Sequence, residues 1–171
     1  MAESKDFGAL VTISAEAVGQ PGQRRFRVRM LSANGDSATC WMEKEQLTAL
    51  RDALSTILKD EGYSYVQVPL DDRAPDPALP LNSDTEFQTG QLSVGVNREA
   101  KRAAVIAAGR PESGEGDVIT VSAEFDFRRA YEFCVQISEV VNAGRPSCPL
   151  CSGPIDPAGH MCVKTNGHKP H

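Results

Sequence analysis

Histidine is almost missing from this chain of 171 residues, and its three histidines all lie near the C-terminal end, at His160, His168 and His171. Everything before position 160 therefore lacks the side chain that most often acts as a general base near neutral pH. No Ser-His-Asp or Cys-His arrangement can be recognised, and the carboxylates have no catalytic motif around them. These absences argue against an enzyme without excluding one.

Long apolar runs and an excess of positive charge are also missing. Residues 1–7 are charged and lead into no long apolar stretch, so we expect neither a signal peptide nor a membrane span. The 18 lysines and arginines are outnumbered by 23 acidic residues, which gives a formal net charge of −5. Bulk electrostatics do not favour nucleic-acid binding, so such binding would need a local basic patch.

The cysteines fall into two groups. Cys40 and Cys134 stand alone within apolar stretches and are predicted to be reduced core residues. The other three lie close together near the C-terminal end in a metal-binding pattern. This usage is typical of a reducing compartment, so we expect a cytoplasmic protein.

The C-terminal cysteines form the sharpest motif of the sequence. Cys148 and Cys151 make a C-x2-C pair, and His160 and Cys162 follow as a second pair. Three thiolates and one imidazole complete the tetrahedral shell of a Zn²⁺ ion. The fourth ligand is His160 or, through a longer step after Cys162, His168.

The tail, residues 147–171, is too short and too polar to bury a core, so it needs a metal or disulfides to hold a shape. A catalytic zinc would need an open coordination position and a nearby general base. Asp156 is the only carboxylate side chain of the tail, which favours a structural site. The alternatives are a flexible tail with exposed thiols and a redox C-x-x-C, although no βαβ pattern precedes the motif.

Two apolar helical stripes share one spacing at a constant offset of 83 residues. The first consists of Leu47, Leu50, Leu54, Ile57 and Leu58, and the second of Ala130, Phe133, Ile137, Val140 and Val141. Asp126 is a suitable N-cap for the second helix, and Gly62 and Gly144 are expected to end the two helices. The repeated pattern predicts an internal duplication.

Three strand-like runs precede each predicted helix. In the first half they are residues 10–18, 25–31 and 37–42, and in the second half residues 87–97, 103–108 and 118–125. A further strand at residues 63–70 would join either sheet. The two halves would pack through their helices or join their sheets.

The predicted fold is α+β, with two tandem βββα repeats in which each antiparallel sheet is covered by one helix, plus a small C-terminal zinc knuckle. The predicted repeats are residues 1–68 and 85–146. Residues 69–84 are predicted to be a stiff, exposed Pro-rich linker, and residues 147–171 the knuckle.

Strand alternation predicts a row of arginines on one face of a sheet. Arg25, Arg27 and Arg29 alternate with apolar residues, so all three point to the same side. Such a row can hold phosphates. The alternative is a solvated strand whose arginines pair with neighbouring carboxylates.

A second, smaller basic cluster is expected at a hairpin tip, where Arg98, Lys101 and Arg102 lie close together. It is either part of a nucleic-acid surface or a solvent-exposed turn. The loop at residues 109–117 contains three glycines but lacks the Gly-Lys-Ser/Thr end of a P-loop, so we interpret it as a hairpin loop.

Several stretches resemble an uncharacterised bacterial family of domains of unknown function. They are VGQPG at 18–22, EKEQ at 43–46, AGRP at 143–146, CPLC at 148–151, PIDP at 154–157, GH at 159–160, the cysteine at 162 and TNGH at 165–168. The resemblance covers nearly the whole chain, although residues 163–164 are Val-Lys where the family pattern has Pro-Arg. It implies a cytoplasmic protein without an established activity, whose genes lie near those of a phosphoglycerate-mutase-like phosphatase and a phosphoinositide-kinase-like protein.

The chain is also similar in predicted architecture to Pur-type and Whirly-type proteins, which bind single-stranded nucleic acids with repeated sheet-plus-helix units. Arg51-Asp52-Ala53-Leu54 in the first predicted helix resembles the Pur pattern. Fold likeness alone is weak evidence of function.

From these patterns we expect a non-catalytic cytoplasmic adaptor that binds a protein partner and uses the zinc knuckle as a rigid docking element. The alternative is a single-stranded nucleic-acid-binding protein that uses the basic strand face. A third option is an enzyme acting on a phosphorylated small molecule. No membrane partner is expected.

Overall fold

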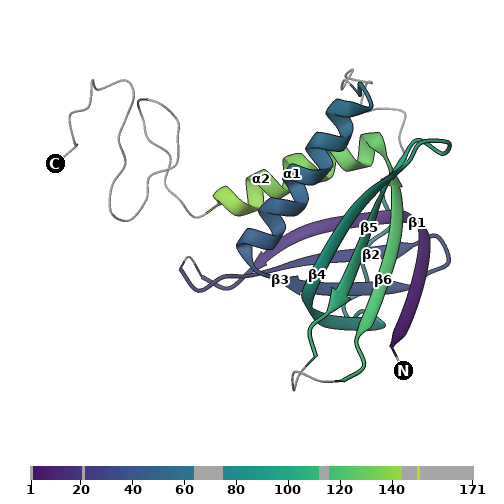
Figure 1. Ribbon diagram of the computed structural model, residues 1–171. Coiled ribbons are helices and arrows are strands. Elements are labelled where there is room, and N and C mark those ends of the chain that lie inside the picture. The colour runs from purple at the N-terminus through teal and green to yellow at the C-terminus, as the bar shows by residue number, and fades with distance from the viewer. Residues whose placement is uncertain (1, 21, 64–74, 112–115, 144–149, 151–171) are drawn as a thin grey trace.

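The computed structural model describes residues 2–20, 22–63, 75–111, 116–143 and 150. The elements are, in chain order, β1 (Glu3–Val18), β2 (Arg25–Ser32), β3 (Ser37–Met42), α1 (Lys44–Asp60), β4 (Thr85–Asn97), β5 (Arg102–Gly109), β6 (Ile119–Asp126) and α2 (Phe127–Asn142) (Figure 1). The protein is thus mixed α+β. Within the described ranges the order β-β-β-α occurs twice.

The six strands form one closed barrel in the order β1-β2-β3-β4-β5-β6. The expectation of two antiparallel sheets holds only within each half, where β1, β2, β3 and β4, β5, β6 pair antiparallel. Two parallel pairs, β3 with β4 and β1 with β6, join the halves and close the barrel.

The length of β1 and β4 explains this closure. β1 begins at Glu3 rather than at residue 10, and its first part pairs with β6 while its second part pairs with β2. The pairing register shifts between Leu10 and Thr12. β4 likewise pairs first with β3 and then with β5, and its register shifts just after Thr89. Bulges bend and twist a strand, so each of these strands passes from one half's sheet into the other's.

The helices begin and end near the predicted residues. The Asp126 carboxylate accepts a hydrogen bond of 2.7 Å from the Arg129 backbone N–H, which confirms the predicted N-cap of α2. Gly62, with a φ of 68°, follows α1, and its N–H donates to the Lys59 carbonyl at 3.1 Å. Gly144 and residues 64–70 lie outside the described residues. Neither described helix combines the length and apolarity that a membrane-crossing helix needs.

The two halves share one hydrophobic core. Its largest fully buried side chains include Leu47 and Leu54 of α1, Ile137 of α2 and Phe125 of β6. Phe125 meets Phe133 of α2 edge to face, with ring centroids 6.2 Å apart. The helices pack against each other, α1 lying mainly against β4 and α2 mainly against β1. Each helix therefore contacts the first strand of the other half rather than covering only its own sheet.

Candidate functional site

The arginine row of β2 lies on the outside of the barrel, while the three apolar residues that alternate with it are buried. Glu16 of β1 stands opposite Arg27 in the strand register. Arg27 Nε donates to Glu16 Oε2 at 2.6 Å, and Arg29 Nη1 lies 3.4 Å from Glu16 Oε1. One carboxylate thus serves two of the three guanidinium groups. This pairing is what the alternative of a solvated strand with neighbouring carboxylates predicts.

Arg25, the third arginine of the row, stacks on Trp41 of β3. Its guanidinium carbon lies 4.2 Å from the indole centroid, and that of Arg27 lies 5.3 Å away. Trp41 Nε1 in turn donates to Glu86 Oε1 of β4 at 2.6 Å. Cation–π contacts at exposed sites contribute about 0.5–1 kcal/mol. The row therefore belongs to a network of alternating charge that spans β1 to β4.

The described part of the Pro-rich connection, residues 75–84, which we term the crossing segment, runs over the outer face of the first half. Its contacts follow the order of the elements that it passes: Asp76 with Arg129 of α2, the Pro77 carbonyl with Thr12 of β1, the Pro80 carbonyl with Arg29 of β2, and Ser83 and Asp84 with Thr39 and Ser37 of β3.

These contacts attach the crossing segment firmly to the barrel. The ion pair between Asp76 and Arg129 is bidentate, at 2.7 and 3.2 Å, and the Arg129 side chain is only 14% exposed. Thr12 Oγ1 donates to the Pro77 carbonyl at 2.7 Å. Residues 75–84 thus cover the outer face of β1, β2 and β3, although several of their own side chains are exposed.

The corresponding outer face of β4, β5 and β6 has a different character. Within the strand registers, Ile106 lies between Ser93 of β4 and Ser122 of β6. We term this surface the open face; its residues are Gln91, Ser93, Gly95, Ala104, Ile106, Ala108, Thr120, Ser122 and Glu124. Ile106 lies at the centre of the open face and is 43% exposed. In Figure 1 the three strands face the viewer and both helices lie above them. Among the described residues, no connecting segment crosses this face.

Ile106 occupies in the second half the position that Arg29 occupies in the first. Arg29 pairs with Thr39, and Ile106 pairs with Ser122. Thr39 and Ser122 stand five residues before the first residues of α1 and α2, respectively. Where the first half places a guanidinium that holds the crossing segment, the second half places an exposed aliphatic side chain.

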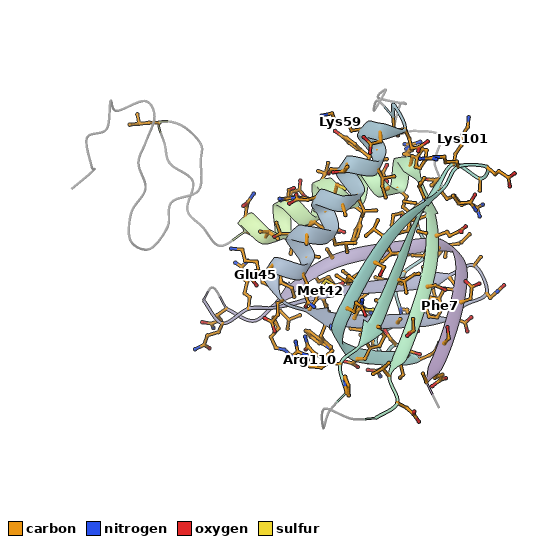
Figure 2. All side chains as sticks on the ribbon, viewed as in Figure 1. Phe7, Met42, Glu45, Lys59, Lys101 and Arg110 are labelled. Carbon is orange, nitrogen blue, oxygen red and sulfur yellow. The ribbon has the colours of Figure 1, made fainter. Side chains whose placement is uncertain are left out.

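The second basic cluster is separate from the first. Arg98 pairs with Glu61 at 2.9 Å beyond the end of α1, and Arg102 lies 3.8 Å from Glu124. Figure 2 shows Lys101 at the opposite end of the barrel from Met42. Met42 pairs with Phe26, the neighbour of Arg25, and so marks the position of the first basic cluster. The two predicted basic clusters thus do not form one continuous surface.

Sequence reasoning missed a cavity of about 280 Å³ between the starts of β1, β3 and β4. It is lined by Lys5, Asp6, Phe7, Asp36, Ser37, Asp84 and Thr85. Lys5 Nζ donates to Thr85 Oγ1 at 2.8 Å. Three carboxylates against one ammonium make this cavity a poor site for an anion. The sequence signal for this cavity was weak, because the first residues of β1 are polar and show no clear alternation of apolar and polar side chains.

A family model described as "Protein of unknown function (DUF3090)" matches residues 5–162. The chain belongs to the DUF3090 family. No curated protein shows a match to the chain. The match agrees with the resemblance to an uncharacterised family, while the likeness to Pur-type and Whirly-type proteins stays a prediction.

The predicted zinc ligands of this DUF3090 chain, Cys148, Cys151, His160, Cys162 and His168, lie outside the described residues. Within the described ranges, no three His, Cys, Asp or Glu side chains are grouped so that they could hold a metal ion. The family match includes the first four of these ligands and ends before His168.

Cys40 of β3 and Cys134 of α2 are buried and form no disulfide, as the sequence predicts. Burial raises the pKa of the Cys40 thiol to about 12. Burial also raises the pKa of Cys134, against smaller opposing effects of Ser55 and Arg51. Both thiols therefore stay protonated near neutral pH, which makes them poor nucleophiles and poor metal ligands.

Proposed function

We propose that this DUF3090 protein is a non-catalytic adaptor that binds a protein partner through the open face. One observation carries the proposal: the outer face of the first half is covered by the chain's own crossing segment, whereas that of the second half exposes Ile106 among small side chains. Small residues let another backbone approach closely, and an exposed aliphatic side chain supplies an anchor.

The size of the open face indicates a second contact. Three strands about 4.8 Å apart and about five residues long, at roughly 3.3 Å per residue, span only a few hundred Å² in plan. A stable interface covers about 800 Å² on each partner. The partner must therefore contact neighbouring surface as well, and the tail is suited to this as a rigid docking element.

The tail is proposed to hold one structural Zn²⁺ through Cys148, Cys151, Cys162 and His160. His168 is the alternative to His160 as the fourth ligand. We expect Cys148→Ser to remove stoichiometric zinc, whereas Cys40→Ser should retain it because Cys40 is buried in the barrel. Metal analysis of both purified variants tests this, and full zinc content in the Cys148→Ser protein would disprove the site.

Single-stranded nucleic-acid binding is the second candidate, favoured by the exposed Arg25 stacked on Trp41. Because Glu16 already pairs with Arg27 and Arg29, we expect this binding to be weak. Fluorescence anisotropy with short single-stranded DNA and RNA at two salt concentrations decides it, since phosphate contacts weaken steeply with salt. Micromolar, salt-sensitive binding that Arg27→Glu abolishes would establish this function in place of the adaptor.

An enzyme acting on a phosphorylated small molecule is the third candidate. The 280 Å³ cavity offers it little support, because Asp6, Asp36 and Asp84 line the cavity against Lys5 alone. A phosphorylated substrate would be repelled there at neutral pH.

The two halves are further proposed to be tandem βββα repeats that arose by duplication, and the protein to be cytoplasmic. Thr39, which pairs with Arg29, and Ser122, which pairs with Ile106, lie the same number of residues before α1 and α2, and this equal spacing supports the duplication. The buried, unpaired thiols of Cys40 and Cys134 suit a reducing compartment and support the second proposal.

The adaptor is tested by comparing zinc-loaded full-length protein with Ile106→Asp and Val135→Asp variants. Val135 of α2 is a matched control, because its side chain is also 43% exposed and lies on a helix away from the open face. A partner captured from the native host should bind wild type and Val135→Asp, and the purified partner should lose at least tenfold in affinity for Ile106→Asp. Equal affinity for all three proteins would refute the open face as the partner site.

A further inference from the structure

We infer that the tail of the same chain lies across the open face, as the crossing segment lies across the outer face of the first half. This inference rests on the proposed function for its choice of surface, and on the proposed duplication and zinc site for the route and the fold of the tail. It makes the tail an internal occupant of the open face, so an external partner displaces the tail from Ile106 and then contacts both the face and the tail.

The route of the crossing segment provides the first argument. The segment follows α1, passes α2 at Arg129, and then crosses β1, β2 and β3 in that order. The tail follows α2 in the same way. The offset of 83 residues that relates the two helices makes Gln46 of α1 the counterpart of Arg129 of α2. The equivalent route leads from α1 across β4, β5 and β6, which is the open face.

Chain length allows this route. Residues 61–84 suffice to connect the end of α1 to β4 and to cross the first face on the way. Residues 143–171 follow α2, which is a longer stretch of chain. The tail therefore has the reach to make the matching crossing and to fold around a zinc ion within it.

Complementary chemistry supports the contact. The first face holds its crossing segment partly through Arg29, which binds a carbonyl oxygen, whereas Ile106 at the matching position needs an apolar partner. The apolar residues of the tail are Leu150, Ile155, Met161 and Val163. Leu150 is 52% exposed in the structure, so its side chain is accessible to such a contact.

The test uses the zinc-loaded full-length protein, labelled on methyl groups and on backbone nitrogen, in NMR experiments. We expect nuclear Overhauser effects between the Ile106 methyl groups and protons of residues 147–171. The NMR order parameters of the tail amides should be about 0.85 in wild type and in Val135→Asp, and should fall below about 0.6 in Ile106→Asp. Unchanged spectra of β1, β2 and β3 in both variants serve as the control for folding.

Several outcomes would overturn the inference. Absence of contacts from Ile106 to the tail would do so, as would tail order that is unaffected by Ile106→Asp. Contacts seen only between differently labelled copies, together with a doubled mass in light scattering, would assign the face to a second copy of the chain. Partner binding that needs Ile106 without any tail contact would sustain the adaptor and refute this inference. Contact between the tail and Ile106, together with no partner that needs Ile106, would sustain this inference and refute the adaptor.

Discussion

Thr89→Val should stabilise the protein. Thr89 is fully buried in β4, and its Oγ1 atom has no hydrogen-bond partner among the described residues. Burying an unsatisfied hydroxyl costs about 1–3 kcal/mol, and valine replaces it with a methyl group of nearly the same shape. A β-branched residue is also favoured in a strand. We therefore expect the free energy of unfolding to rise by about 1 kcal/mol or more.

Thr12→Val is the matched control. Thr12 is also a buried threonine in a strand, but its Oγ1 donates to the Pro77 carbonyl at 2.7 Å. Valine removes this bond and loosens the crossing segment, so the free energy of unfolding should fall by about 0.5–1.5 kcal/mol. The same substitution thus has opposite signs at the two positions.

Urea unfolding of the zinc-loaded proteins, followed by circular dichroism, measures both changes. Thermal unfolding should show shifts of about 2–4 °C per kcal/mol for a protein of this size. If Thr89→Val destabilises as much as Thr12→Val, the Thr89 hydroxyl is satisfied in solution, for example by a buried water, and the reasoning fails.

Three other predictions follow from the surface charges and from the Cys40 thiol. Glu16→Gln should lower the free energy of unfolding, measured in urea, by about 1–2 kcal/mol, because it removes the carboxylate that pairs with two partly buried arginines. Asp52→Asn is the control, since the Asp52 side chain that pairs with Arg51 is 64% exposed. This variant should change the free energy of unfolding by less than about 0.5 kcal/mol. An equal effect of both would contradict the network. The native Cys40 thiol should resist Ellman's reagent at pH 8, because burial raises its pKa from 9.0 to about 12, and rapid native labelling would exclude this burial. Its contribution to stability is complete below pH 9.0 and should decline as the pH rises towards 12, measurable by urea unfolding at each pH.

Hydrophobic periodicity predicted most of the secondary structure. The stripe of Leu47, Leu50, Leu54 and Leu58 is buried as the helical spacing requires, and β3 agrees with its predicted range at both ends. Local rules succeeded here because each amphipathic element has one face on a shared core. The Asp126 cap was also predictable, since it needs only its own first helical turn.

Barrel closure could not be predicted in the same way. It depends on parallel pairs between strands distant in sequence, and on bulges in β1 and β4 that leave no clear signal in the pattern. The residues at the start of β1 are mostly polar, so alternation does not mark them as a strand. The crossing segment was predicted only as a linker, because its attachment rests on single contacts such as Thr12 with the Pro77 carbonyl.

The open face was missed for a different reason. Arginines attracted attention in β2, whereas the equivalent outward positions of β5 carry alanine and isoleucine, which are easily taken for core residues. The register shows instead that Val105 points inward and Ile106 outward.

The two halves differ chiefly in the side chains on the outside of the barrel. Matching inward positions keep similar chemistry: Val28 and Val105 are both buried at equivalent places in β2 and β5. Matching outward positions do not, since Arg29 corresponds to Ile106 and Trp41 to Glu124. Core positions are limited by packing in both halves, whereas outward positions are limited only by what covers them. The first half's outer face suits a polar segment with free carbonyl groups, and the second half's suits an apolar partner, so the second half is where an interaction should be sought.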